Sequence, residues 1–428
     1  MELLKEYFEV ADDVSLEDVD KVVGGDYQRI TLENAEEMLG RLVVAGEEFF
    51  EDVSSMEALL LSESGVSLEA RNEIVDKIKD YSAIFGVGDT GVSLESIEDD
   101  ELFVEVSLET LTDFTGRFVQ VYANLFKGTY DAAIGALTSS KTSAEKLRKR
   151  LLKAKTIWDG KKNNLDSRNV VSSYAGQDIF YAFFRDGKMQ REPLKVLEED
   201  FKITNYVLGD FQKDVSDYAK KLSSIIASGK YGSEKDFLGS VIGPIGRLGN
   251  VSDLFNQSYV TNNPILLTNR NWKYKKKEKE PKVKGEGKEI SFYVKTATER
   301  KLVINEDFFN SLSDTSKVVY HDIKYPTSDV DKIITVLIKY CDAVISHTDN
   351  SNRLMGPHKE VVAQFKRLKG NKGMDVGKNG KALLGSLTRL AKYVMDYQIT
   401  PAKHEISRVN FIVSRASIYI TRVVKRTK

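Results

Sequence analysis

Residues 110–138 of this chain, TLTDFTGRFVQVYANLFKGTYDAAIGALT, carry its strongest secondary-structure pattern. Large apolar side chains recur there at the i, i+3, i+4 and i+7 spacing: Leu111, Phe114, Phe118, Val121, Tyr122 and Leu125. Because that spacing places side chains on one side of a helix, the stretch predicts a long amphipathic helix whose apolar face is buried in a core.

Helical spacing continues through most of the C-terminal side of the chain. A very basic helix is expected to begin at Ser143, a good N-cap residue, and a long helix is expected to run from Pro193 to a C-cap at Gly229. Four more helices are predicted, at residues 328–348, 357–370, 381–398 and 401–426. The short connections between them favour antiparallel neighbours in a bundle.

Residues 260–305 interrupt this pattern. Short runs of β-branched and aromatic residues predict a small β-element around residues 262–305, with a lysine-rich loop inside it. The predicted fold class is therefore mainly α, with a helical leader and a multi-helix body that carries this β-element. Four domains are predicted. Residues 1–109 form an acidic propeptide and residues 110–260 a basic helical domain. Residues 261–326 form a small β-containing segment and residues 327–428 a C-terminal helical bundle.

The leader itself is expected to hold two short helices and an exposed connection. The helices fall at residues 31–53 and 68–85, where Thr31 and Ser67 can act as N-caps. Residues 92–109 are so acidic that they predict an exposed, mobile segment.

Charge divides the chain at residue 109, although the net charge of the whole chain is only −1. Residues 1–109 contain 30 acidic and 7 basic residues, a net charge of −23. Residues 110–428 contain 34 acidic and 56 basic residues, a net charge of +22. An asymmetry of this size predicts that the basic part binds a polyanion such as nucleic acid, and that the acidic part shields it while the two are joined.

No pattern in the sequence predicts an enzyme, and no cofactor is expected. The four histidines are scattered and have no partner at metal-ligand spacing, and the single cysteine, Cys341, falls on an apolar helix face and allows no internal disulfide. The stretch GMDVGKNGK resembles a phosphate-binding loop but lacks its spacing and the strand before it. No run of 18 apolar residues is present, so no membrane span is expected.

The tetrapeptide VSLE occurs four times, always within the acidic part, with its glutamate at Glu17, Glu69, Glu95 and Glu109. One interpretation is a helix start, because serine caps a helix and glutamate favours its positive end; Ser67 and Ser107 fit this role. The other is a protease recognition site, in which a small residue, any residue and glutamate precede the cleaved bond. The last copy, Ser107-Leu108-Glu109 before Thr110, coincides with the charge boundary and is the main predicted site; Glu17, Glu69 and Glu95 mark additional sites.

Repeated Ser-Leu-Glu sites in an acidic leader, followed at once by a helical body with basic helices, resemble the internal head proteins of giant tailed phages of the phiKZ-like group. The resemblance implies that the prohead protease cuts after Glu in Ser/Ala/Gly-x-Glu sites. It also implies that the leader is lost during head maturation, while the body stays inside the capsid with genomic DNA and other capsid or core proteins. Such a protein is made in the host cytoplasm and can later be ejected into a host.

Basic residues after the boundary are the expected nucleic-acid contacts. Because few aromatic residues are interleaved with them, contact with the phosphate backbone is favoured over base reading. The candidates are Lys146, Arg148, Lys149, Arg150, Lys275, Lys276, Lys277, Arg422, Lys425 and Arg426.

The sequence thus favours a non-enzymatic virion protein, matured by cleavage after Glu109. Two alternatives stay open at this point. One is a virion-carried enzyme or host-takeover factor without a recognisable motif. The other is a cytoplasmic helical interaction protein in which VSLE is only a cap.

Overall fold

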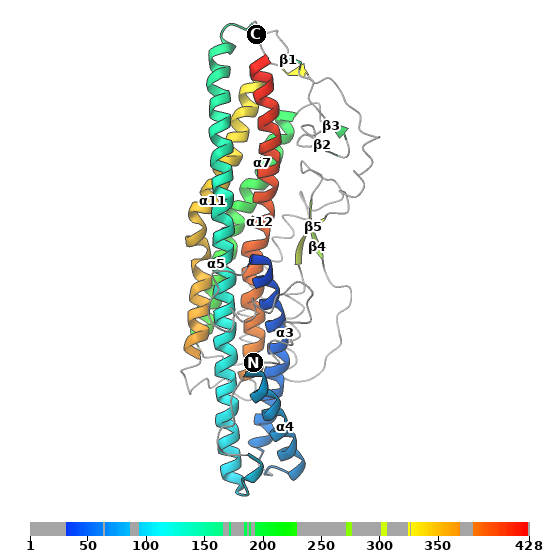
Figure 1. The fold of residues 1–428 in the computed structure, drawn as a ribbon, viewed down its shortest axis with the longest axis vertical. Coiled ribbons are helices and arrows are strands. Elements are labelled where there is room, and N and C mark those ends of the chain that lie inside the picture. The colour runs from blue at the N-terminus through cyan, green and yellow to red at the C-terminus, as the bar shows by residue number, and fades with distance from the viewer. Residues whose placement is uncertain are drawn as a thin grey trace.

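The structure of the chain, a computed structural model, describes residues 31–62, 65–85, 94–165, 193–228, 327–368 and 380–426, together with six short strands. Long helices dominate and lie side by side in an elongated bundle (Figure 1), which confirms the mainly helical fold class. The helices are α3 (Leu32–Leu60), α4 (Leu68–Phe85), α5 (Asp100–Lys162), α7 (Pro193–Leu208), α8 (Asp210–Ser228), α11 (Thr327–Leu368) and α12 (Gly380–Arg426), with a 3₁₀ turn, η2, at Leu94–Ser96.

Helix α5 is the longest of the described elements, with 63 residues, and at 1.5 Å per residue it extends for about 95 Å. Its N-cap is Asp99, whose side chain accepts a hydrogen bond of 2.9 Å from the Leu102 amide. The helix joins the predicted helix at residues 110–138 to the basic helix expected at Ser143, so no break exists there. The reason is that buried positions recur at helical spacing across the junction, at Leu137, Ala144, Leu151, Ala154 and Trp158.

Two prolines also fail to end their helices. Pro357 lies inside α11 and Pro401 inside α12, where the sequence predicted helix boundaries. An internal proline costs a helix about 3 kcal/mol. Buried apolar residues flank both positions, and their burial outweighs that cost: Met355 and Val361 around Pro357, and Ile399 and Ala402 around Pro401.

The helix starts proposed for the leader are correct in two cases and wrong in one. The Thr31 hydroxyl accepts from the Asn34 amide at 3.3 Å, and the Ser67 hydroxyl accepts from the Ala70 amide at 3.2 Å. Ser107 caps nothing, because it lies inside α5. Pro193 begins α7 as predicted, but the helix ends at Leu208 and Gly209 separates it from α8. The proposed C-cap at Gly229 lies outside the described residues.

The connection expected to be exposed before residue 110 is ordered where the structure describes it. Leu94 and Ile97 are buried around the 3₁₀ turn, and Phe103 is buried in the first turn of α5. These three apolar side chains anchor a segment that its acidic composition alone marked as solvated. Most of the other described side chains of residues 94–109 are exposed, as predicted, but residues 100–109 belong to α5 and do not form a separate connection.

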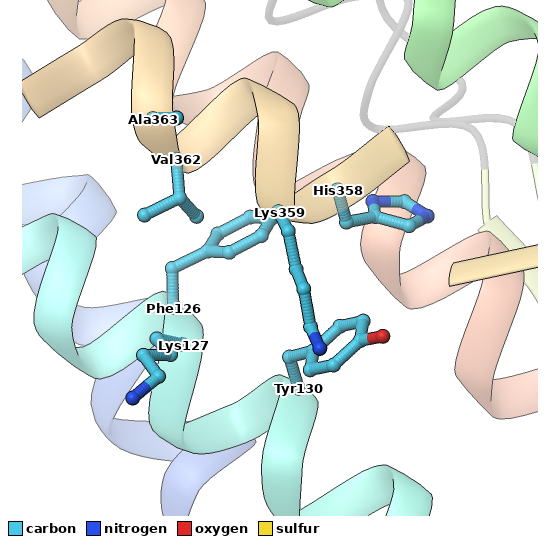
Figure 2. A pocket seen from close by; sticks show the side chains of 7 residues that line it. All are labelled: Phe126, Lys127, Tyr130, His358, Lys359, Val362 and Ala363. Carbon is cyan, nitrogen blue, oxygen red and sulfur yellow. The ribbon is translucent and has the colours of Figure 1, made fainter. Parts of the chain in front are cut away.

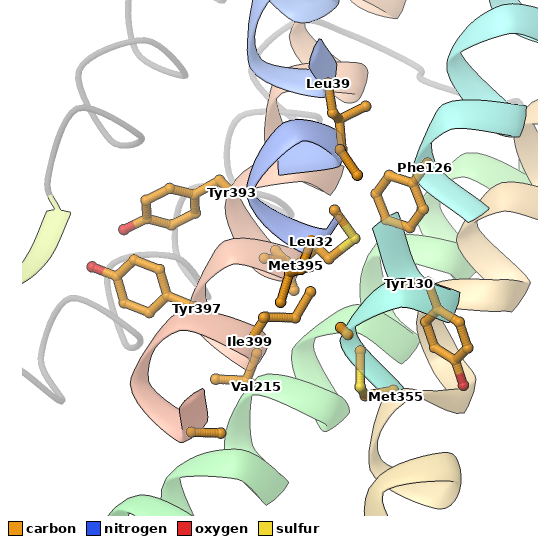
Figure 3. Close-up of a cluster of buried hydrophobic side chains, with 14 of the residues drawn as sticks. Leu32, Leu39, Phe126, Tyr130, Val215, Met355, Tyr393, Met395, Tyr397 and Ile399 are labelled. Carbon is orange, nitrogen blue, oxygen red and sulfur yellow. The ribbon is translucent and has the colours of Figure 1, made fainter. Parts of the chain in front are cut away.

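One hydrophobic core runs through the bundle and includes the described helices of the leader, α3 and α4. Buried residues of α3, α5, α8, α11 and α12 belong to the same cluster, and Figure 3 shows Leu39 of α3 beside Phe126 of α5, with Met395 and Ile399 of α12 nearby. Helix α3 packs against both α5 and α12, and α4 packs against α5. The acidic part of the chain is thus a structural part of the bundle.

The strands are short and pair antiparallel in three two-stranded sheets. β1 (Val171–Ser172) pairs with β6 (Lys324–Tyr325), and β2 (Phe184–Arg185) pairs with β3 (Lys188–Met189). β4 (Asn271–Lys275) pairs with β5 (Lys301–Asn305), in a register that sets Trp272 opposite Ile304. The remainder of residues 262–305, including the lysine-rich loop, lies outside the described residues, so the extent of the β-element stays a prediction.

Candidate functional site

The VSLE copy at residues 66–69 lies on the surface. Ser67, Leu68 and Glu69 are exposed, and the Leu68 side chain retains 76% of its accessible area. The copy forms the start of α4 and follows Gly65, whose φ of 73° gives the chain a left-handed turn. An exposed leucine makes no packing contribution at a helix start, whereas a recognition site needs its side chains accessible.

The last copy has the opposite environment. Ser107 and Thr110 are buried, Leu108 is half-buried against the core, and Glu109 is exposed. The Thr110 hydroxyl donates to the Val106 carbonyl at 2.8 Å within α5. Proteases bind extended substrates, so a cut after Glu109 requires the first turns of α5 to open.

Of the two other copies, residues 14–17 lie wholly outside the described residues, and residues 92–95 are described only in part. Leu94 is buried in η2, while Glu17 and the side chain of Glu95 lie outside the described residues.

Aromatic side chains join the leader to the body around Phe118 of α5. Phe49 and Phe50 of α3 lie 5.5 and 5.0 Å from the Phe118 ring of α5, measured between ring centroids. Gly46 allows this approach, because a Cβ atom there would lie 2.3 Å from Phe118 Cζ. Helix α12 contacts α3 through Gly385, where a Cβ atom would lie 3.4 Å from the Cα of Glu47.

Acidic residues of α3 contact basic residues of α12. Both carboxylate oxygens of Glu47 accept hydrogen bonds from the Arg389 guanidinium, and both side chains keep only 17% of their exposure. Glu33 accepts from Lys403 at a more exposed position. A bidentate, partly buried arginine–carboxylate pair is a strong form of ion pair. The leader thus neutralises cations of the body directly.

A third leader carboxylate is less well paired. Burial, and next the nearby Asp396, raise the pKa of Glu36 to about 7, against the opposing effect of Lys403 and Lys392. Its buried Oε1 atom makes no hydrogen bond within the described part of the chain. Glu36 is therefore protonated in the folded chain over a pH range in which an exposed glutamate is ionised.

We expect Glu36→Gln to stabilise the chain at high pH only. Because the folded-state pKa lies above the ordinary 4.5, the favourable effect of a neutral Glu36 is complete below pH 4.5 and is lost as pH rises through 7. The variant stays neutral, so its free energy of unfolding should match the parent near pH 5 and exceed it by about 2 kcal/mol at pH 8, after allowance for solvent screening. Urea unfolding at the two pH values measures this. If the variant and the parent differed in free energy of unfolding by the same amount at pH 5 and pH 8, the prediction would be contradicted.

The predicted nucleic-acid contacts are divided between exposed and paired positions. Lys146, Lys149 and Arg150 are exposed on α5, and Arg422 and Lys425 are exposed near the end of α12. Arg148 donates to Asp342 of α11 at 2.5 Å. Lys276 and Lys277 lie outside the described residues, as do the side chains of Lys275 and Arg426.

The ends of the two basic helices lie side by side. Lys161 of α5 donates to the Val424 carbonyl of α12 at 3.0 Å, and Figure 1 shows both helices ending at the same end of the bundle. Aspartates of α11 neutralise the side of α5 that faces them, including Asp331 at 2.7 Å from Lys155. Within the described ranges, exposed cations from the predicted set thus lie on α5 and in the last turns of α12.

A buried cluster of charges, which the sequence patterns did not reveal, joins α7, α11 and α12. The Arg408 guanidinium donates to both oxygens of Asp200 at 2.7 Å and to Glu405 at 2.9 Å. Tyr340 donates to Asp200 at 2.6 Å, and Thr204 donates to Glu405 at 2.6 Å. All five residues are buried, and burial raises the pKa of Asp200. These contacts tie α7, α11 and α12 together, so the cluster fixes the register of the three helices.

A cavity of about 260 Å³ lies between α5 and α11. Figure 2 shows Lys359 reaching from α11 toward the Tyr130 ring, and its Nζ lies 4.7 Å from that ring's centroid. Burial lowers the pKa of His358, which also lines the cavity, to about 4, so the imidazole is neutral at pH 7. The lining is otherwise Phe126, Lys127, Val362 and Ala363, which offers no nucleophile with an adjacent base.

Among the described residues, no group of three or more His, Cys, Asp or Glu side chains is arranged to hold a metal ion. None of the helices in the described ranges combines the length and hydropathy needed to cross a membrane. Comparisons with protein-family models, with curated proteins and with solved structures found no match to this chain.

Proposed function

We propose that this chain is an internal virion protein of a phage, made with an acidic leader that the prohead protease removes by cutting after Ser-x-Glu sites. The mature, basic body packs non-specifically against genomic DNA inside the capsid. One observation carries the proposal: the last Ser-Leu-Glu copy coincides with the change from a net charge of −23 to +22. Helix capping alone does not require four identical tetrapeptides within the acidic part.

The contacts of α3 support a shielding role for the leader. Glu47 and Glu33 bind Arg389 and Lys403 of the body, so the leader's negative charge is held against the body. While the leader is present, it lowers the attraction of the body for a phosphate backbone. Its removal frees these cations, and each cation available for a phosphate contact adds to affinity through counterion release.

Loss of α3 also uncovers an apolar surface. Phe118 and its neighbours on α5, together with the side of α12 around Gly385, are covered by α3 in the full chain. A large exposed apolar patch of this kind is typical of a surface that binds another protein. A capsid or core protein is the partner that fits this role in our proposal.

One observation favours the second candidate, a helical interaction protein that is never processed. The Glu109–Thr110 bond lies inside α5, and the residues on both sides of Glu109 face the core. On that alternative the acidic helices are permanent parts of the bundle.

DNA binding tests the shielding role proposed for the leader. We expect residues 110–428, produced by cutting the full chain, to bind duplex DNA at least about tenfold more tightly than the uncut chain at low salt, with the difference shrinking as salt increases. A full-length chain carrying Glu33→Gln and Glu47→Gln should fall between the two. Fluorescence anisotropy over a salt series measures the affinities. Equal affinity of cut and uncut chains would refute shielding.

A further inference from the structure

The accessible and the buried Ser-Leu-Glu copies are joined by one arginine. Arg71 stands two residues after Glu69, in the first turn of α4. Its guanidinium donates to Asp100 at 3.0 Å and to the Ile97 carbonyl, and it lies 4.2 Å from the centroid of the Phe103 ring. Asp100 and Phe103 lie in the first turn of α5, the helix that contains the Glu109–Thr110 bond, and Ile97 lies just before its N-cap Asp99.

Arg71 is itself held by the first VSLE copy that the structure describes. The Arg71 amide donates to the Ser67 carbonyl at 2.9 Å, and the Ala70 amide donates to the Ser67 hydroxyl at 3.2 Å. A cut after Glu69 removes both acceptors and leaves Arg71 as the second residue of a new, uncapped chain end. The first turn of α4 then frays, because its amides have lost the cap that satisfied them.

We infer that processing is sequential: the cut after Glu69 releases Arg71 from the start of α5, and this release opens the site at Glu109. The inference rests on the proposed function. In the intact chain the surface copy is the available one, since Leu68 is exposed and Ser107 is buried. Without Arg71, the first turn of α5 loses a hydrogen bond at Asp100 and a cation–π contact at Phe103, and the segment before it loses a hydrogen bond at Ile97. The first turns of α5 therefore open more often.

The order of cuts also keeps α3 attached to the body until the protease has cut after Glu69. A protease that meets the intact chain finds Glu69 and not Glu109, so α3 and its carboxylates stay covalently attached up to the first cut. After that cut, residues 70–109 remain the only covalent extension of the body. Their removal completes maturation.

The test uses a time course of proteolysis of the full chain, followed by intact mass measurement. A general Glu-specific endoproteinase reports accessibility alone, and the prohead protease reports the proposed function. We expect both to cut after Glu69 before Glu109. Glu69→Gln should slow the cut after Glu109 about tenfold, and Arg71→Met should speed it about tenfold in chains still intact at Glu69.

Arg41→Met is the matched control, because Arg41 is a leader arginine whose guanidinium binds Glu37 on its own helix at 2.7 Å. It should leave the rate at Glu109 unchanged. Equal rates at Glu109 in the parent and in Glu69→Gln, or no effect of Arg71→Met, would overturn the inference. Failure of the prohead protease to cut any variant, with the order preserved for the Glu-specific enzyme, would instead reject the proposed function.

Discussion

Replacing Arg408 by methionine is expected to lower the free energy of unfolding by about 3–5 kcal/mol. The guanidinium is the only cation of the described cluster, and its removal leaves Asp200 and Glu405 as two buried carboxylates with no compensating charge. Tyr340 and Thr204 keep one hydrogen bond to each carboxylate, which cannot replace a full opposite charge. Chemical denaturation followed by circular dichroism measures the loss.

The matched control is Arg422→Met, an exposed position on the same helix, which should change stability by less than about 0.5 kcal/mol. Combining Arg408→Met with Asp200→Leu and Glu405→Leu should restore most of the loss, because no buried charge then remains. A loss below about 1 kcal/mol for Arg408→Met alone would show that the three helices are not joined by this cluster.

Gly46→Ala is expected to destabilise the chain by about 1–3 kcal/mol, although alanine normally favours a helix over glycine. The added methyl group would lie 2.3 Å from Phe118 Cζ, so α3 must move away from α5 or Phe118 must leave its position. Thermal unfolding gives the size of the loss, and limited proteolysis shows whether α3 becomes accessible.

Gly135→Ala is the control, since Gly135 is exposed on α5 and a Cβ atom there meets nothing within 4 Å. It should gain about 0.5–1 kcal/mol from helix propensity. The pair Gly46→Ala with Phe118→Leu should recover part of the loss, because leucine leaves room for the methyl group. A gain in stability for both single glycine variants would mean that α3 does not pack on α5.

The helical fold could be predicted because periodicity reports burial directly. Of the six residues that defined the apolar face of residues 110–138, Leu111, Phe114, Phe118, Tyr122 and Leu125 are buried and Val121 is half-buried. The predicted breaks at Pro357 and Pro401 were wrong because local helix-ending rules were outweighed by burial on both sides of each proline.

The candidate site was less accessible to prediction. Glu405 stands three residues after Ala402 and four before Val409, both buried, and this placement on an apolar helix face was the one available sign of a buried charge. Arg408, which binds Glu405, also binds Asp200, and these two residues are 208 positions apart in the chain. No local pattern therefore joins the two carboxylates. The Ser-Leu-Glu copies could be found as a repeated sequence motif. The sequence did not show that residues 67–69 lie exposed at the start of α4, whereas Ser107 is buried inside α5.

The mass of this chain in purified phage particles tests the central claim most directly. If the leader is removed during head maturation, intact mass spectrometry should find a chain that begins at Thr110 and therefore lacks residues 1–109. A chain in those particles that continues through Glu109 into the leader would contradict the account.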